Sequence, residues 1–234
     1  MRQPPATALL RPMRVLAIET SCLRGSVALV EAGTVVAEGS HSRANAHGES
    51  IQPLIEAALA EAGWARSRLD RVAVGVGPGS FTGLRVGIAL ALGIGEGLGI
   101  EVVGVGSMAA MAAAAPASAG LRCAVLDARR DEVFAAAYTQ AGQQSLEPVA
   151  LPRDTALSWL RARLPEEPCW VGAGCTLVGV EARPWPGSDL PSARWTAQLG
   201  AEATGGGELV RPNYVRNDVA VRPWLPPNPL GSPR

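Results

Sequence analysis

Residues 71–98 read RVAVGVGPGSFTGLRVGIALALGIGEGL, and this stretch contains a strand, a tight loop and a helix in succession. Arg71–Val76 is apolar and rich in valine, which predicts a buried strand. The loop that follows spans Gly77–Gly83 and leads into a helix expected over 82–97. A glycine-rich loop between a strand and a helix N-terminus is typical of α/β folds, where it accommodates an anion or tight backbone packing.

Small residues recur every four positions along this expected helix, at Gly83, Gly87, Ala91 and Gly95. Glycine inside a helix costs about 1 kcal/mol relative to alanine, so the pattern needs a physical reason. A stripe of small residues lets another backbone approach closely. Two interpretations stay open: packing on the chain's own sheet, and a helix–helix contact with another molecule.

The segments before and after this unit follow the same α/β pattern. Three strands are expected at 14–20, 26–30 and 35–39, and a helix begins near His47 and stops at Gly63. The apolar residues of that helix fall on one stripe: Ile51, Leu54, Ile55, Ala58, Leu59 and Ala62. A strand at 101–105 and an alanine-rich helix from Ser107 complete the first unit.

The second half repeats this order in shortened form, with strands expected at 122–126, 133–138 and 146–151 before a helix at 154–164. Two such lobes with a cleft between them define the actin-like ATPase (ribonuclease H-like) α/β fold. The predicted division is a disordered leader at 1–12, an N-terminal lobe at 13–115, a smaller C-terminal lobe at 116–222 and a Pro-rich tail at 223–234.

The composition limits the chemistry. All 21 basic residues are arginine and they balance 21 acidic residues, so the net charge is zero and no global field favours nucleic acid or membrane. The absence of lysine excludes a P-loop and Schiff-base chemistry. His41 and His47 are the only histidines and the four cysteines form no C-x-x-C pair, which argues against a zinc site. No signal peptide or membrane span is expected, so the predicted location is cytoplasmic.

Several residues are candidates for chemistry. In an actin-like fold the first β-turn approaches nucleotide phosphates, and Glu19, Thr20 and Ser21 occupy that turn, which indicates weak ATP or ADP binding at most. Ser80 does not form a nucleophile elbow, because position 78 is proline. Arg129–Glu132 is typical of a solvated turn.

Four stretches together carry a resemblance to a known family. They are Leu16–Thr20, His47–Glu49 leading into Pro53–Ile55, Val74–Arg85, and Asp127–Val133. In this order they resemble the TsaB (YeaZ) family. The signature loop is its most specific part: Gly77, Pro78, Gly79, Ser80, Phe81, Thr82, Gly83, Leu84 and Arg85. The resemblance implies an actin-like fold and a role in making N6-threonylcarbamoyladenosine on tRNA.

The resemblance also implies partners. The family pairs with a catalytic paralogue, TsaD, and recruits the ATPase TsaE, so tRNA contact is expected only indirectly. The paralogue holds its metal with a His-x-x-x-His pair, and the matching positions here are Ser107 and Met111. The chain is therefore expected to be a non-catalytic scaffold that needs no metal or cofactor.

Pairing with TsaD, or with a second copy when the chain is alone, is implied to run through the two N-terminal helices. The expected interface residues are Ile51, Leu54, Ile55, Ala58, Leu59, Gly83, Gly87, Ala91 and Gly95. Two other functions stay open. One is an enzyme, a degenerate actin-like kinase or a "glycoprotease"-type hydrolase; the other is a regulator that binds a nucleotide without turnover.

Overall fold

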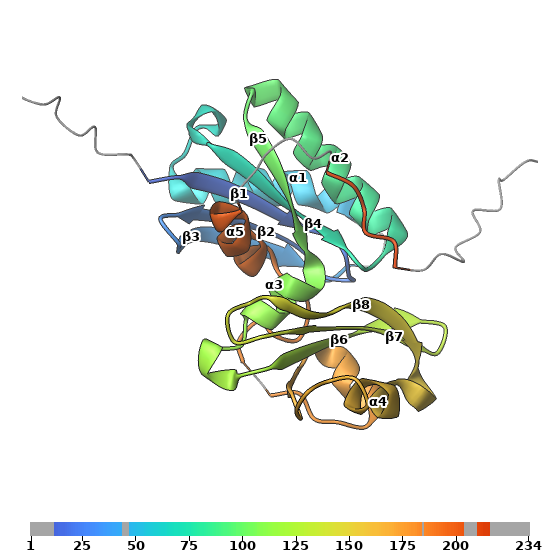
Figure 1. The fold of residues 1–234 in the computed structure, drawn as a ribbon. Helices are drawn as coiled ribbons and strands as arrows, with labels where there is room; N and C mark the ends of the chain where they lie inside the picture. The colour runs from blue at the N-terminus through green and yellow to red at the C-terminus, as the bar shows by residue number, and fades with distance from the viewer. Residues whose placement is uncertain (1–11, 44–46, 184, 204–209, 216–234) are drawn as a thin grey trace, which may run out of the picture.

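The computed structural model describes residues 12–43, 47–183, 185–203 and 210–215, which form two stacked α/β lobes (Figure 1). The expected leader, apart from Pro12, and the expected tail at 223–234 lie outside these residues. The two-lobed actin-like fold predicted from the strand and helix order is confirmed.

The first lobe is built on a five-stranded sheet with the order β3-β2-β1-β4-β5. Its strands are β1 (Arg14–Glu19), β2 (Gly25–Glu31), β3 (Thr34–His41), β4 (Arg71–Gly77) and β5 (Glu101–Gly106). The first three strands pair antiparallel, whereas β4 is parallel to both β1 and β5. The ends of β1 and β4 therefore point toward the same edge of the sheet, which is the edge that faces the second lobe.

Helices cover both faces of this sheet, which explains why its central strands are apolar throughout. One face carries α1 (His47–Ala62) and α2 (Phe81–Leu98), and the short η1 (Arg66–Arg68) follows α1. The opposite face carries α5 (Ala193–Glu202) and part of α3 (Ser107–Ala113).

The second lobe is a four-stranded sheet with the order β8-β7-β6-β9. It comprises β6 (Arg122–Arg129), β7 (Glu132–Tyr138), β8 (Gln144–Pro152), α4 (Arg153–Arg161), β9 (Cys169–Val171) and η3 (Ala173–Val178), after the short η2 (Ala117–Ala119). One face packs on α4 and η3. The other face packs on α3, so this one helix lies in the cores of both lobes.

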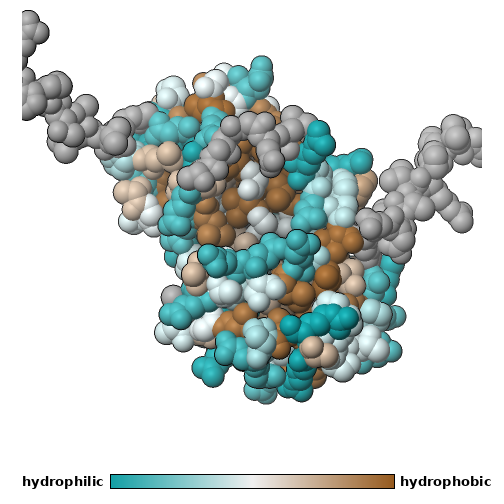
Figure 2. Space-filling view, viewed as in Figure 1, coloured by the Kyte–Doolittle hydropathy of each residue, from teal (hydrophilic) through white to brown (hydrophobic). Residues whose placement is uncertain are grey.

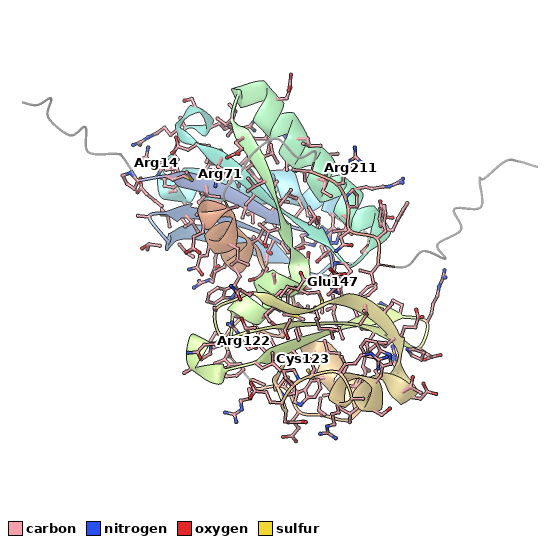
Figure 3. The ribbon with its side chains drawn as sticks, in the orientation of Figure 1. Arg14, Arg71, Arg122, Cys123, Glu147 and Arg211 are labelled. Carbon is pink, nitrogen blue, oxygen red and sulfur yellow. The ribbon has the colours of Figure 1, made fainter. Side chains whose placement is uncertain are left out.

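The expected second lobe at 116–222 needs one correction, because the chain returns to the first lobe at its C-terminal end. Helix α5 packs on the first sheet, where a Cβ at Gly200 would lie 2.4 Å from the Cβ of Ala73. Arg71 fixes the end of α5 by donating to the carbonyls of Gly200 and Ala203 at 2.8 and 2.9 Å (Figure 3). The periodicity of α5 shows a short helix but carries no information on which sheet it covers.

The small-residue stripe of α2 packs on the chain's own sheet, which decides between the two interpretations. Cβ atoms at Gly83 and Gly87 would lie 2.0 and 2.2 Å from atoms of Thr20, and one at Gly95 would lie 2.2 Å from Val102. Ala91 is fully buried in the same core. The expectation that these four residues form an intermolecular contact is therefore corrected.

The apolar stripe of α1 is likewise used inside the lobe. Of its five expected interface residues, four are buried in the core beneath the helix: Ile51, Ile55, Ala58 and Leu59. The fifth, Leu54, is half-buried against that core. Any docking face on these helices must lie on their outer sides.

Helix α2 meets the length and hydropathy criteria for a membrane span over Phe81–Leu98, although no span was expected from the sequence. One third of that window is buried in the protein. Its inner side packs as a core helix of an α/β lobe, and its outer side exposes Ala89, Leu92 and Gly93 beside the charged residues Arg85 and Glu96. Figure 2 shows hydrophobic residues exposed on this face of both lobes.

Candidate functional site

A cleft of about 910 Å³ separates the two lobes. The first lobe contributes the turn after β1, the start of α1 and the signature loop with the start of α2; the second contributes the β6–β7 hairpin. Leu190 and the C-terminal segment 213–215 complete the lining. Most of the lining is apolar, and Leu23 is 48% exposed within it. Clefts of this size with few polar groups are the usual form of a binding site.

The signature loop is fastened to the turn after β1, which explains its glycines. The N–H of Ser80 donates to the carbonyl of Ser21 at 2.6 Å. A Cβ at Gly79 would lie 2.1 Å from the same carbonyl oxygen, so no larger residue fits. The Ser80 hydroxyl accepts from the N–H of Gly83 at 3.2 Å and caps α2. The loop therefore places the N-terminus of an 18-residue helix at the cleft.

Glu19 points away from the cleft into the core of the first lobe. Its carboxyl group accepts hydrogen bonds from the Ser21 N–H at 2.8 Å and the Ser107 hydroxyl at 3.1 Å. The Thr196 hydroxyl of α5 lies 3.4 Å from the same group and 3.1 Å from the carbonyl of Ser192. Complete burial raises the pKa of Glu19, and the hydrogen bonds from Ser21, Ser107 and Thr196 offset this only in part.

The other two expected nucleotide contacts have different environments. Thr20 is fully buried, and its hydroxyl donates to the carbonyl of Gly83 at 2.8 Å, which ties α2 to β1. Ser21 alone of the three lines the cleft. The structure therefore does not bring Glu19, Thr20 and Ser21 together on one exposed surface. The Glu19 carboxyl group is directed into the lobe toward Ser107, and the Thr20 hydroxyl is directed toward α2.

His41 and His47 are joined in a directed chain of hydrogen bonds. A carbonyl only accepts, so the Nε2 of His47 donates to the carbonyl of Cys22 at 2.9 Å. The N–H of Arg43 donates to the Nδ1 of His41 at 3.3 Å, which leaves the Nε2–H of His41 to donate to the Nδ1 of His47 at 3.2 Å. Burial, His47 and Arg43 lower the pKa of His41. The pair fixes the start of α1 to the turn after β1. The Nδ1 atom of each ring already accepts a hydrogen bond, so neither ring has a free lone pair.

Gly25 makes this histidine pair possible. A Cβ at that position would lie 2.5 Å from the Nε2 of His41 and 2.6 Å from the Nδ1 of His47. Any other residue would displace both rings from the start of β2.

The β6–β7 hairpin brings two arginines to the cleft in a strained conformation. Arg129, Arg130 and Asp131 have φ angles of 63°, 52° and 58°, the left-handed region that glycine and asparagine usually fill. Each such residue costs roughly 1–2 kcal/mol. The expectation of a solvated turn is confirmed for Arg129, Arg130 and Asp131, which are exposed, and Arg129 and Arg130 also line the cleft. Left-handed geometry in a non-glycine residue cannot be read from the sequence.

An aromatic and cationic stack stands at the mouth of the cleft. The rings of Phe81 and Tyr214 are stacked with centroids 5.2 Å apart, and the guanidinium of Arg85 lies 3.9 Å from the Phe81 centroid. Arg85 also donates to the Tyr214 hydroxyl at 3.2 Å, and the Asn213 N–H donates to the carbonyl of Val76 at 2.7 Å. The segment 210–215 is thereby held along α2 and β4.

Ser107 and Met111, which match the paralogue's metal-binding positions, are core residues here. Both are 0% exposed. The Ser107 hydroxyl donates to Glu19 and accepts from the N–H of Gly77 at 3.1 Å. The Met111 side chain packs on Gly172, where a Cβ would lie 2.8 Å from its terminal methyl. Within residues 12–43, 47–183, 185–203 and 210–215, no three His, Cys, Asp or Glu side chains gather as a metal site.

A second stripe of small residues lies on the outer side of α2 and was not singled out from the sequence. Ala89, Gly93 and Gly97 are exposed at four-residue spacing, and a Cβ at Gly93 or Gly97 would meet nothing within 4 Å. Leu92 beside them is 38% exposed. The four-residue period was visible in the sequence, but both stripes show it, and only the structure tells the inner one from the outer one.

Comparisons with known proteins agree with this geometry. Residues 34–164, just over half of the chain, match the family model described as TsaD, tRNA N6-adenosine threonylcarbamoyltransferase. The solved structure of YeaZ from Pseudomonas aeruginosa superposes with a TM-score of 0.71 at 30% identity, covering 86% of this chain and 99% of that one.

Two curated relatives extend the comparison. The tRNA threonylcarbamoyladenosine biosynthesis protein TsaB of Bacillus subtilis is 33% identical over 149 residues, which cover 63% of this chain and 65% of the relative. An uncharacterised protein of Mycobacterium tuberculosis is 42% identical over 73 residues, which cover 30% of this chain and 35% of the relative. The chain thus spans about a third of the length of the first curated relatives that it matches.

Proposed function

Because the chain belongs to the TsaB (YeaZ) family, we propose that it is a non-catalytic partner subunit in the synthesis of N6-threonylcarbamoyladenosine on tRNA. In this role it binds and activates a TsaD-type catalytic paralogue in the cytoplasm, and a TsaE-type ATPase joins the pair. Contact with tRNA is then mainly the partner's, in keeping with a net charge of zero.

The observation that carries the non-catalytic role is the packing of Ser107 and Met111. Both side chains fill the joint core of α3, and Ser107 links Glu19 to the backbone of Gly77. Neither a serine committed to two hydrogen bonds nor a buried thioether is a ligand for a hard or borderline catalytic metal. Glu19, the nearest acid, is itself buried and directed into the lobe.

The outer side of α2 is the docking surface that we propose for the partner. Ala89, Gly93 and Gly97 leave a shallow groove in an apolar helix, and Leu92 projects beside it. Small residues at four-residue spacing allow a partner helix to approach closely. Helix α1 lies beside α2 on the same face of the sheet and extends the surface. A second copy of the chain uses the same face when the partner is absent.

This surface is tested by placing a bulky charge in the groove. We expect Gly93→Arg to weaken binding to the TsaD-type paralogue of the same organism by about a hundredfold or more, because its long side chain fills the groove and prevents close approach of a partner helix. Isothermal titration calorimetry with the purified paralogue measures the affinity. Ser158→Arg, on the exposed side of α4, is the matched control and retains wild-type binding.

Wild-type affinity in a folded Gly93→Arg protein would place the interface elsewhere. Thermal unfolding of both variants excludes misfolding as the cause of a loss.

A further inference from the structure

We propose that Arg24 forms a salt-sensitive latch with Asp189 and Leu190, which holds the second lobe against the turn after β1 and covers the thiol of Cys22. Opening of the latch exposes this thiol while both lobes stay folded. The latch belongs to the joint between the lobes, so its behaviour does not depend on whether the chain is a partner subunit.

The latch consists of three hydrogen bonds from one guanidinium group. Arg24 lies in the turn that leads into β2, and its Nη1 and Nη2 atoms donate to the two carboxyl oxygens of Asp189 at 3.0 and 3.1 Å. The Nη2 atom also donates to the carbonyl of Leu190 at 2.9 Å. A bidentate pair fixes the planes of both groups, and it is the geometry in which an exposed arginine–carboxylate pair contributes most.

The acceptors of the latch are attached to the second lobe. The carbonyl of Asp189 accepts from the N–H of Ala173, the first residue of η3, at 2.8 Å. Leu190 packs against the core that β6, β7 and α3 share. Separation of Arg24 from these two residues therefore separates the turn after β1 from the second lobe.

The acidic side of the latch is open to solvent. The side chain of Asp189 is 58% exposed, whereas that of Arg24 is 21% exposed. Among the residues that the structure describes, neither side chain makes a second ion pair. Dissolved ions screen such a pair, because the Debye length falls from about 10 Å at 0.1 M salt to about 3 Å at 1 M. High salt is therefore expected to weaken the latch and to leave the apolar cores intact.

Cys22 is the group that the latch covers. Its side chain is 9% exposed, and its thiol donates to the carbonyl of Arg24 at 3.3 Å. Burial raises the pKa of Cys22 to about 12, and the carboxyl groups of Glu19 and Asp189 act in the same direction. A buried, protonated thiol is inert, because the thiolate is the nucleophile. Entry of water at the latch therefore makes Cys22 reactive.

The other three cysteines are internal references, since all of them lie in the second lobe. Cys123 on β6 and Cys175 on η3 are 0% exposed in the core of that lobe, so they react only when the lobe unfolds. Cys169 on β9 is partly exposed, and its reaction reports the direct effect of salt on alkylation.

The test is alkylation of the full-length chain by iodoacetamide at pH 8, with the modification of each cysteine measured by mass spectrometry relative to Cys169. We expect the relative rate at Cys22 to rise at least about threefold between about 0.1 and 1 M sodium chloride, because ions screen the latch. Cys123 and Cys175 should stay unmodified over the same time at both salt concentrations. A rate at Cys22 that does not respond to salt would contradict the latch.

Two variants remove the latch but have opposite direct effects on the thiol. Asp189→Asn removes a negative charge near Cys22, which by itself favours the thiolate, whereas Arg24→Met removes a positive charge, which by itself disfavours it. Loss of the latch exposes the thiol in both. We therefore expect both variants to raise the rate at Cys22 by about threefold or more at low salt and to abolish its dependence on salt.

Arg194→Met is the matched control. Arg194 makes the same kind of bidentate pair, with Glu38 at 3.0 and 2.6 Å, but this pair joins α5 to β3 within the first lobe. The variant should leave the rate at Cys22 and its salt dependence as they are in the wild type.

A wild-type rate at Cys22 in Arg24→Met would overturn the proposal. A rise confined to Asp189→Asn would do so too, because it is what the change of charge alone produces. Equal acceleration at Cys22, Cys123 and Cys175 would also count against the latch, since unfolding of the whole chain would then explain the exposure.

Discussion

At the scale of single residues, Glu19 has a structural role that its position in the sequence did not indicate. A carboxyl group at the end of β1 was expected to face a nucleotide, yet it is enclosed by Ser21, Ser107 and Thr196. Gly75 on β4 leaves the space that it fills, since a Cβ there would lie 2.1 Å from a carboxyl oxygen. The side chain's direction depends on β4, α3 and α5, which no local motif near Glu19 encodes.

The raised pKa of Glu19 leads to a prediction on pH. Between the unfolded value of about 4.5 and the raised folded value, the folded state binds more protons than the unfolded state. Stability from this group is therefore fully present below pH 4.5 and falls as pH rises through the folded pKa. We expect Glu19→Gln to remove that loss, because its amide keeps an acceptor for the Ser21 N–H and carries no charge.

Thermal unfolding of both proteins from pH 5 to 8 tests this. The difference between the Glu19→Gln and wild-type midpoints should grow with pH, and the subtraction cancels contributions from other groups such as His41. A difference that is constant or shrinks with pH would contradict the account.

At the scale of elements, the sequence predicted nearly every strand and helix but not all of their surroundings. The period-two and period-3.6 patterns placed β1–β8 and α1–α4 within a few residues, because burial on a sheet or helix face repeats at those spacings. The sequence did not show which side of α2 faces the core. Glycine recurs on both its inner and outer sides, and only the position of Thr20 and Val102 shows which side is filled.

The two stripes of α2 give opposite predictions for one substitution. Gly87→Ala places a methyl 2.2 Å from the Thr20 hydroxyl and should destabilise the fold by about 1–3 kcal/mol. Gly93→Ala meets open space and should stabilise it by up to about 1 kcal/mol through helix propensity. Urea unfolding of the two variants measures both effects. The same sign in both would show that the assignment of inner and outer faces is wrong.

At the scale of the whole molecule, the cleft depends on contacts between segments far apart in the sequence. Helix α3 lies in both cores, and Arg24 in the first turn pairs with Asp189 through two hydrogen bonds of 3.0 and 3.1 Å. The carbonyl of Asp189 accepts from the N–H of Ala173 in the second lobe at 2.8 Å. These links, and the return of α5, set the lobe arrangement; pairings across so many residues leave no local sequence signal.

We propose above all that this two-lobed chain acts by providing a helical surface to which a catalytic partner binds. Its most direct test is reconstitution of tRNA threonylcarbamoylation with the TsaD-type paralogue, in the presence of the wild-type chain, of Gly93→Arg, or of neither. The account predicts modification with the wild-type chain, and little or none with the folded Gly93→Arg protein or without the chain. Full modification by the partner alone would contradict it.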